Sequence, residues 1–278
     1  MLFSSIPTLR MLSTQLGCEE QTKHGICWYE CNTTADKVAY IFHGVTGNKL
    51  DMIPLAERYV GFGYAVYLVD LPGHGGSARQ EINTYSDLVD WFMDVITLVN
   101  RPPHLIIGTS FSSSILYHAL STRMIPSQTK IILGCPTPDV SNLASCTYTL
   151  FSKMPEVLGW GIYNLRASQY VRALFALKTI RRDAWLWLLE SEQSKKRSLT
   201  LRDGLLLSAL LCNQNPYVAE VPTEYQHDIT IILGDKDNVI TPRTSAIMRR
   251  QLPKALIISV PNAGHLLQFE AVSSYPDV

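Results

Sequence analysis

The sequence predicts an α/β protein: a mostly parallel central sheet, helices on both faces, and a helical segment inserted before the last two strands. Short apolar runs alternate with longer stretches of helical spacing, a rhythm typical of βαβ units. Several of these runs are apolar almost throughout, as strands covered on both faces must be. The rhythm stops near residue 139 and resumes near residue 228. The intervening stretch therefore forms an insertion.

Seven apolar runs are predicted strands. In chain order they are GICWYEC from Gly25, KVAYIFH from Lys37, YAVYLVD from Tyr64, HLIIGT from His104, KIILGC from Lys130, DITIILG from Asp228 and ALIISV from Ala255. Helical spacing between the strands predicts helices over 51–59, 85–99, 113–123 and 243–251.

The chain divides into a core, residues 1–138 and 224–278, and a helical insertion, residues 139–223. Apolar patches such as DAWLWLLE from Asp183 and LLLSALL from Leu205 indicate helices in the insertion. An insertion between two strands of one sheet lies over their carboxyl ends, where open α/β sheets bind ligands. We therefore expect this segment to act as a lid.

The amino-acid composition limits the classes of molecule that this protein is expected to bind. The chain has 278 residues, of which 46% are hydrophobic, enough for one large α/β domain with an insertion. The 24 basic residues equal the 24 acidic ones, so no net charge favours nucleic acid or an anionic membrane surface. We expect a small-molecule substrate and no nucleic-acid partner.

The cysteines and the N-terminal stretch bear on location. The six cysteines show no CxxC spacing, and we expect free thiols, in keeping with a reducing compartment. Pro7 and Arg10 interrupt the first residues before an apolar core of signal-peptide length accumulates. No later segment approaches the roughly 20 apolar residues of a membrane span. These features predict a soluble, cytoplasmic protein with no integral membrane segment.

The stretch GTSFS places Ser110 where a predicted strand ends and a helix begins. It nearly matches the nucleophile elbow G-x-S-x-G, in which a tight turn requires small residues on both sides of the serine. Gly108 meets this requirement. Position 112, where the pattern has a second glycine, holds serine, which is also small. The alternative is a serine-rich cap on an ordinary strand-to-helix turn.

A serine nucleophile needs a base and an orienting acid. His265, in NAGHLLQFE, follows the last predicted strand, and Asp237, in ILGDKDNVITP, follows the preceding one. Asp235 and Asp139 also follow predicted strands and remain alternatives for the acid.

Metal and cofactor signals are absent from the sequence. The seven histidines form no HxxxH-type pair with a matching carboxylate, and no GxGxxG follows a strand. We expect neither a metal nor a cofactor.

Five motifs resemble those of the α/β-hydrolases in residue type and spacing. They are HGVTG from His43, DLPGHGGS from Asp70, GTSFSS from Gly108, GDKDNVITP from Gly234 and NAGHLLQFE from Asn262. The order Ser, Asp, His along the chain is also that of this family. The resemblance implies the α/β-hydrolase fold and a triad of Ser110, His265 and Asp237.

The resemblance further implies an oxyanion hole formed by the backbone N–H groups of Val45 and Phe111. In this family the residues matching His43 and Gly44, like His74, shape loops beside the site. Six aromatic residues of the insertion could line an apolar slot or form the insertion's own core. They are Tyr148, Phe151, Trp160, Tyr163, Trp185 and Trp187. Of these, we select Trp160 and Trp185 as candidate substrate-binding residues.

These features favour a serine hydrolase that cleaves a carboxylic ester with an apolar acyl or alcohol part. Residues 69–78 also resemble the menaquinone-pathway synthase, which would turn the same triad to C–C chemistry. That family has an arginine shortly after the elbow, where this chain has Ser114. A third hypothesis is a non-catalytic binding protein on the same scaffold.

Overall fold

The structure is a computed structural model that describes residues 6–126 and 128–278. Its centre is a sheet of eight strands in the order β1-β2-β4-β3-β5-β6-β7-β8. The strands are β1 (Glu19–Lys23), β2 (Ile26–Cys31), β3 (Lys37–Phe42), β4 (Tyr64–Val69), β5 (Leu105–Thr109), β6 (Lys130–Gly134), β7 (Ile229–Gly234) and β8 (Leu256–Val260). All pairings from β4 through β8 are parallel, and β2 is antiparallel to both β1 and β4. The mostly parallel sheet is therefore confirmed.

All seven predicted strands are present, and β1 is an eighth that the apolar pattern missed. Its sequence, EEQTK, lies at the edge of the sheet, where four of its five residues are exposed. An edge strand with both faces in water carries no apolar run, so hydrophobicity gave no signal.

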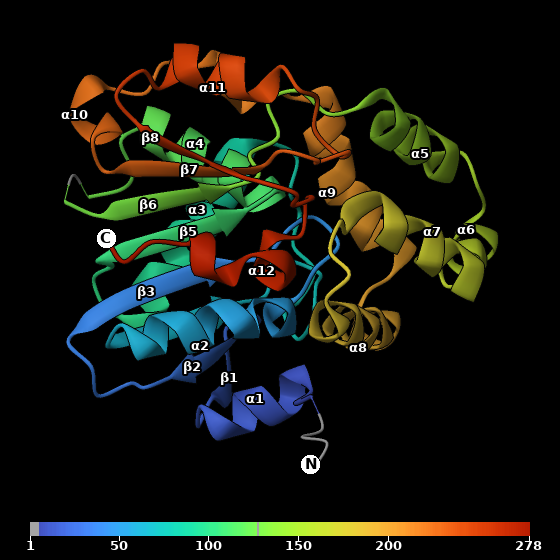
Figure 1. Cartoon of the computed structure of the whole chain (residues 1–278), viewed down its shortest axis with the longest axis horizontal. Helices are drawn as coiled ribbons and strands as arrows, with labels where there is room; N and C mark the ends of the chain where they lie inside the picture. Colours follow the sequence, from blue (N-terminus) through green and yellow to red (C-terminus); the bar gives the residue numbers. More distant parts are fainter. Residues whose placement is uncertain (1–5, 127) are drawn as a thin grey trace.

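Helices cover both faces of the sheet (Figure 1). Alternate residues of β3 show why: Val38, Tyr40 and Phe42 join one buried cluster, and Ala39 and Ile41 join the other. The first cluster includes α3 (Tyr85–Val99), α4 (Phe111–Ser121) and α11 (Thr244–Gln251). The second includes α1 (Leu9–Gln15), α2 (Ile53–Gly61) and α12 (Leu267–Glu270). This double burial explains why the core strands read as continuous apolar runs.

Six α-helices lie between β6 and β7, and we call the first five the helical insert. They are α5 (Asn142–Ser152), α6 (Glu156–Tyr163), α7 (Arg166–Ala176), α8 (Arg182–Ser198) and α9 (Leu201–Asn213), followed by the short α10 (Thr223–Gln226). In Figure 1 the insert lies at one end of the sheet, beyond the carboxyl ends of the parallel strands. α8 and α9 contribute to the two core clusters, whereas α5 and α7 contain no fully buried residue.

The cysteines correct one expectation. Cys18 and Cys31 form a disulfide, whereas Cys27, Cys135, Cys146 and Cys212 are free. The pairing of β1 with β2 explains the bond: Glu19 lies opposite Glu30, so the next position outward brings Cys18 opposite Cys31. Disulfides persist in oxidising environments, so the cysteines no longer support the expectation of a reducing, cytoplasmic location.

The disulfide closes a short loop, since its cysteines are 13 positions apart. Replacing both Cys18 and Cys31 by serine should lower the free energy of unfolding by about 3 kcal/mol, because a cross-link of this length restricts the unfolded chain. Urea unfolding of oxidised protein measures the change, with Cys146→Ser, at an exposed free cysteine, as the control. Equal stability of the double variant and the wild type would contradict the assignment.

Candidate active site

Ser110 lies on the turn between β5 and α4. Its backbone has φ 54° and ψ −115°, a conformation that L-residues rarely adopt, and its N–H donates to the Gly134 carbonyl oxygen at 2.7 Å. A Cβ on Gly108 would lie 2.7 Å from the carbonyl carbon and oxygen of Ser112. Only glycine therefore fits two positions before the serine.

Ser112 has a role of its own in this turn. Its hydroxyl is buried and donates to the carbonyl oxygen of His43. The serine at this departure from the elbow pattern thus connects α4 to the loop after β3.

His265 connects Ser110 to Asp237. Its Nε2 lies 2.8 Å from the Ser110 Oγ, and its Nδ1 lies 2.6 Å from an Asp237 carboxylate oxygen. The backbone N–H of His265 donates to Ala176 O, which ties the histidine loop to the end of α7. The three residues that the sequence singled out therefore form one hydrogen-bonded chain.

Asp237 is held in its ionised form. Its second carboxylate oxygen accepts from the N–H groups of Val239 and Ile240, at 2.8 and 3.3 Å. Burial alone would raise the pKa of Asp237, but His265 and these N–H groups hold that pKa below its ordinary value. An ionised Asp237 favours the His265 tautomer with the proton on Nδ1, which leaves Nε2 free to accept the Ser110 proton.

The two other candidate acids lie elsewhere. Asp139 accepts a hydrogen bond from the Thr241 hydroxyl, and Asp235 is exposed. Of the three aspartates considered from the sequence, Asp237 is the one that contacts His265.

The expected oxyanion donors are the N–H groups of Phe111, which follows Ser110 in the chain, and of Val45, which follows Gly44. Within residues 6–126 and 128–278, neither donates to another protein group, so both remain available to a ligand. Phe111 is the first residue of α4, where the helix dipole favours negative charge. A Cβ on Gly44 would lie 3.2 Å from the Ser110 Cβ, so the loop that carries Val45 passes close to the serine.

His43 and His74 hold this loop. The Nδ1 of His43 donates to Gly44 O, and its Nε2 accepts from the Leu71 N–H, while His74 lies 2.9 Å from Val45 O. Burial lowers the pKa of both histidines, well below the ordinary value for His43. These contacts fit the loop-shaping role expected for the two residues.

A pocket of about 330 Å³ opens at Ser110 and His265. Val45, Gly44 and residues of the helical insert line it. Four of the six aromatic residues considered from the sequence contribute to this lining: Tyr148, Phe151, Trp160 and Tyr163.

Trp185 and Trp187 are not among the lining residues. The indole N–H of Trp185 donates to Thr179 O and its ring lies against Tyr170, while Trp187 donates to Pro7 O. Thr179 and Tyr170 are not lining residues either, so the pocket gives no support for Trp185 as a substrate-binding residue. Trp160 does line the pocket, stacked on Tyr163 at 5.4 Å between ring centroids.

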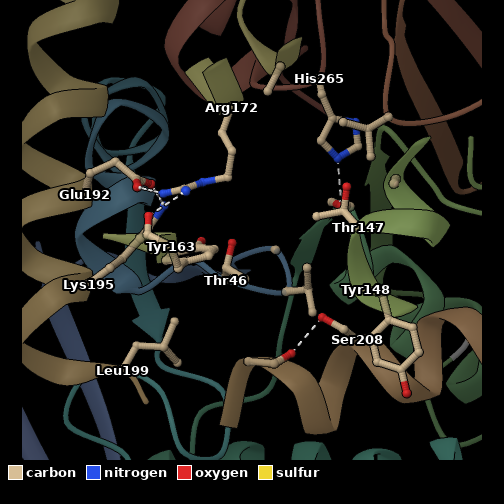
Figure 2. A pocket seen from close by; sticks show the side chains of 18 of the residues that line it. Thr46, Thr147, Tyr148, Tyr163, Arg172, Glu192, Lys195, Leu199, Ser208 and His265 are labelled. Carbon is tan, nitrogen blue, oxygen red and sulfur yellow. Dashed lines mark hydrogen bonds and ion pairs between the residues drawn. The ribbon is translucent and has the colours of Figure 1, made fainter. Parts of the chain in front are cut away.

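Four charged residues that were not predicted from the sequence also line the pocket: Asp51, Arg172, Glu192 and Lys195. Figure 2 shows Arg172, Glu192 and Lys195 together on one side of the pocket, with Tyr148 and Thr147 on the other. One signal existed: Glu192 and Lys195 share a helical face with Leu188 and Leu199, at spacings of four, three and four. Charged residues on an otherwise apolar helical face indicate side chains that are buried with partners of opposite charge.

One group in the described chain has the side chains of a metal site. Ligand atoms of Cys135, Asp237 and His265 lie within 4.8 Å of one another. Both ring nitrogens of His265 already take part in the chain from Ser110 to Asp237, and burial raises the pKa of the Cys135 thiol well above its ordinary value. This arrangement suits proton transfer better than metal binding, which needs a thiolate.

In the described parts of the chain, no helix has the length and apolar character to cross a membrane.

Known proteins share this architecture. An esterase from Exiguobacterium antarcticum superimposes with a TM-score of 0.73 at 14% identity, covering 92% of this chain and 97% of that one. A bromoperoxidase from Bacillus anthracis gives 0.71 at 13% identity, with 90% and 91% covered. At these identities the likeness shows the fold alone, and the names of the two enzymes illustrate that one fold supports different chemistry.

Sequence comparison gives two further matches. Lipase 1 of Psychrobacter immobilis is 26% identical over 86 residues, which are 31% of this chain and 26% of that protein. The aligned segment thus spans about a quarter of that relative. The model of the alpha/beta hydrolase family matches residues 38–276, most of the chain, and this protein therefore belongs to the alpha/beta hydrolase family.

Proposed function

We propose that this hydrolase cleaves carboxylic esters with an apolar part, through an acyl-enzyme on Ser110. The observation that carries the proposal is the position of His265, within hydrogen-bond distance of both Ser110 and Asp237. A hydroxyl becomes a nucleophile near neutral pH when such a base accepts its proton. The aromatic lining of the pocket supports an apolar substrate group.

The steps follow from the geometry. The Nε2 of His265 takes the proton of Ser110 as Oγ attacks the ester carbonyl, and the oxyanion that forms accepts from the N–H groups of Val45 and Phe111. His265 then gives this proton to the leaving alcohol. Water, deprotonated by the same nitrogen, attacks the acyl-enzyme and releases the acid and Ser110. Asp237 keeps the Nδ1–H in place throughout.

C–C cleavage or elimination on the same triad is less favoured. The position of the synthase arginine is occupied by Ser114, whose hydroxyl bonds the hydroxyls of Thr137 and Tyr217 in the core. The pocket does contain Arg172 and Lys195, which would favour a polyanionic substrate if they were unpaired. Both are ion-paired to carboxylates, so the pocket offers no net positive charge.

A non-catalytic binding protein is also less favoured. Ser110 is held in a conformation that costs free energy, and a protein that only binds its ligand has no use for that cost.

We further propose that residues 139–223 form a lid over the core of residues 1–138 and 224–278. The insert supplies most of the pocket's aromatic lining, so it must shift if a large substrate is to enter. α5 and α7 bury no residue fully, which keeps the cost of such a movement low.

Ser110→Ala and His265→Ala should each lower kcat for a chromogenic ester at least roughly 10³-fold, because nucleophile and base act as a unit. Asp237→Asn should also be severe, since it removes the carboxylate that fixes the His265 tautomer. Fluorophosphonate labelling should mark the wild type and fail with Ser110→Ala. Asp139→Asn is the matched control and should stay within a few-fold of the wild type. A mild Asp237→Asn beside a severe Asp139→Asn would contradict the assignment of the acid.

The strained turn predicts an unusual stability result. Ser110→Gly should be about 1–2 kcal/mol more stable than Ser110→Ala, because glycine adopts φ 54° without steric cost and both variants lack the hydroxyl. Urea unfolding measures the difference. At Ser114, inside α4, the same comparison should have the opposite sign, since glycine weakens a helix relative to alanine. The same sign at both positions would rule out strain at Ser110.

The lid proposal predicts uneven hydrogen exchange. Backbone amides of α5 and α7 should exchange at least tenfold faster than those of α3 and α4, because helices with few buried contacts open locally. Mass spectrometry of the native protein gives the rates. Equal protection of all four helices would mean that the insert is as rigid as the core.

A further inference from the structure

Four charged side chains form one side of the pocket, and we call them the charged wall. Asp51 precedes α2, Arg172 is on α7, and Glu192 and Lys195 are one turn apart on α8. The Asp51, Glu192 and Lys195 side chains are only 5%, 11% and 10% exposed, and Arg172 is 28% exposed. Because burial of charges is costly, such groups in a substrate pocket call for an explanation.

The four charges pair with one another. Arg172 Nη2 lies 2.5 Å from one Glu192 oxygen, and Lys195 Nζ lies 3.2 Å from the other. Lys195 also lies 3.4 Å from an Asp51 oxygen. Burial raises the pKa of Asp51, whereas Lys195 beside it favours the ionised form. With both carboxyl groups ionised, two cations face two anions and the net charge of the wall is zero. A substrate anion would meet Asp51 and Glu192, and a substrate cation would meet Arg172 and Lys195.

The pairing leaves hydrogen-bonding capacity unused. Arg172 has five N–H groups, of which three go to Tyr163 O, the Ser168 hydroxyl and Glu192. Lys195 has three, two of which are directed at its carboxylate partners. Within the described residues, the Oδ1 of Asp51 is buried and accepts no hydrogen bond of ordinary geometry, and the nearby Ser191 hydroxyl is buried without a partner as well. Buried polar atoms are nearly always paired in folded proteins, so Asp51 and Ser191 keep unused hydrogen-bonding capacity beside the pocket.

The aromatic stack holds the wall in position. The Arg172 guanidinium lies 3.7 Å from the centroid of the Tyr163 ring, which in turn stacks on Trp160. Arg172 therefore has a fixed orientation, and a substrate gains its hydrogen bonds without the entropic cost of ordering the side chain.

We propose that the charged wall is a subsite for hydroxyl groups of the substrate, so that the favoured esters carry an uncharged hydroxylated group in addition to their apolar part. A hydroxyl matches this wall because it accepts from the spare N–H groups of Arg172 and Lys195 and donates to Asp51. The inference rests on the proposed ester hydrolysis at Ser110. The hydroxyl can belong to the alcohol part, as in a glycerol ester, or to the acyl part.

Three esters test the subsite and separate its two sources. They are methyl octanoate, 1-monooctanoylglycerol, with hydroxyls on the alcohol part, and methyl 8-hydroxyoctanoate, with one on the acyl part. We expect the wild type to prefer one hydroxylated ester over methyl octanoate by roughly tenfold or more in kcat/KM, since a hydrogen bond to a charged group is worth that factor. A preference for neither overturns the inference.

Substitutions assign the preference to the wall. Arg172→Met and Asp51→Asn should each bring the ratio of kcat/KM values close to one, and Asp51→Asn keeps the shape of the side chain if Arg172→Met fails to fold. Arg181→Met is the matched control, since Arg181 forms an exposed ion pair with Asp183 on the same insert and does not line the pocket. An unchanged ratio in both Asp51→Asn and a folded Arg172→Met overturns the inference.

Labelling of Ser110 separates this inference from the proposed function. If fluorophosphonate labels Ser110 and methyl octanoate is cleaved without preference, the hydrolase proposal stands and the hydroxyl subsite falls. If Ser110 is not labelled and no ester is cleaved, both fall.

Discussion

Between β5 and α4 the chain changes from strand to helix over the single residue Ser110, and this turn is the constraint on which the site depends. The positive φ of Ser110 directs its side chain away from the sheet, toward His265. The turn is possible because Gly108 lets the backbone of Ser112 approach to where a Cβ would collide. The first N–H of α4, at Phe111, then lies next to the hydroxyl, so one turn supplies both a candidate nucleophile and a candidate oxyanion donor.

The order of the strands brings the remaining groups to this turn. β5 lies between β3 and β6, and the loop after β3 carries Gly44 and Val45 to the serine. β7 and β8 follow β6 in the sheet, and the loops after them carry Asp237 and His265. Because all these strands are parallel, their carboxyl ends share one edge, and residues more than 100 positions apart in the sequence meet there. The helical insert leaves the sheet at the same edge, between β6 and β7, and this is why its residues line the pocket.

Local patterns allowed part of this architecture to be predicted. α3 begins and ends where its spacing indicated, because Thr84 caps it in a capping box and its apolar face is regular. The core strands were equally clear, since burial on both faces leaves a continuous apolar run. Ser110 and Asp237 could be found because each follows such a strand, and His265 because it follows β8, an edge strand whose sequence is still apolar. β1 and the disulfide were missed for a common reason. β1 is held by its pairing with β2 and has almost no apolar residues, so the apolar pattern could not predict the strand or the pairing that brings Cys18 opposite Cys31.

The charged wall was not predicted because two of its ion pairs join residues that are far apart in the sequence. The positions of Glu192 and Lys195 on an apolar face of α8 were the one signal, and only the folded chain brings Arg172 and Asp51 to them. Four apolar side chains of similar volume would fill the same space without the cost of burying charges, and replacement of buried ion pairs by apolar groups is often neutral or stabilising. Stability therefore gives no reason for this cluster beside a pocket with a largely apolar lining. Recognition of a polar group does, because a desolvated, oriented and internally neutral set of donors and acceptors binds hydroxyls without attracting ions. The same reasoning explains why the wall includes residues of both the core and the insert: a ligand that bridges Asp51 and Arg172 would hold the insert against the sheet while the reaction proceeds at Ser110.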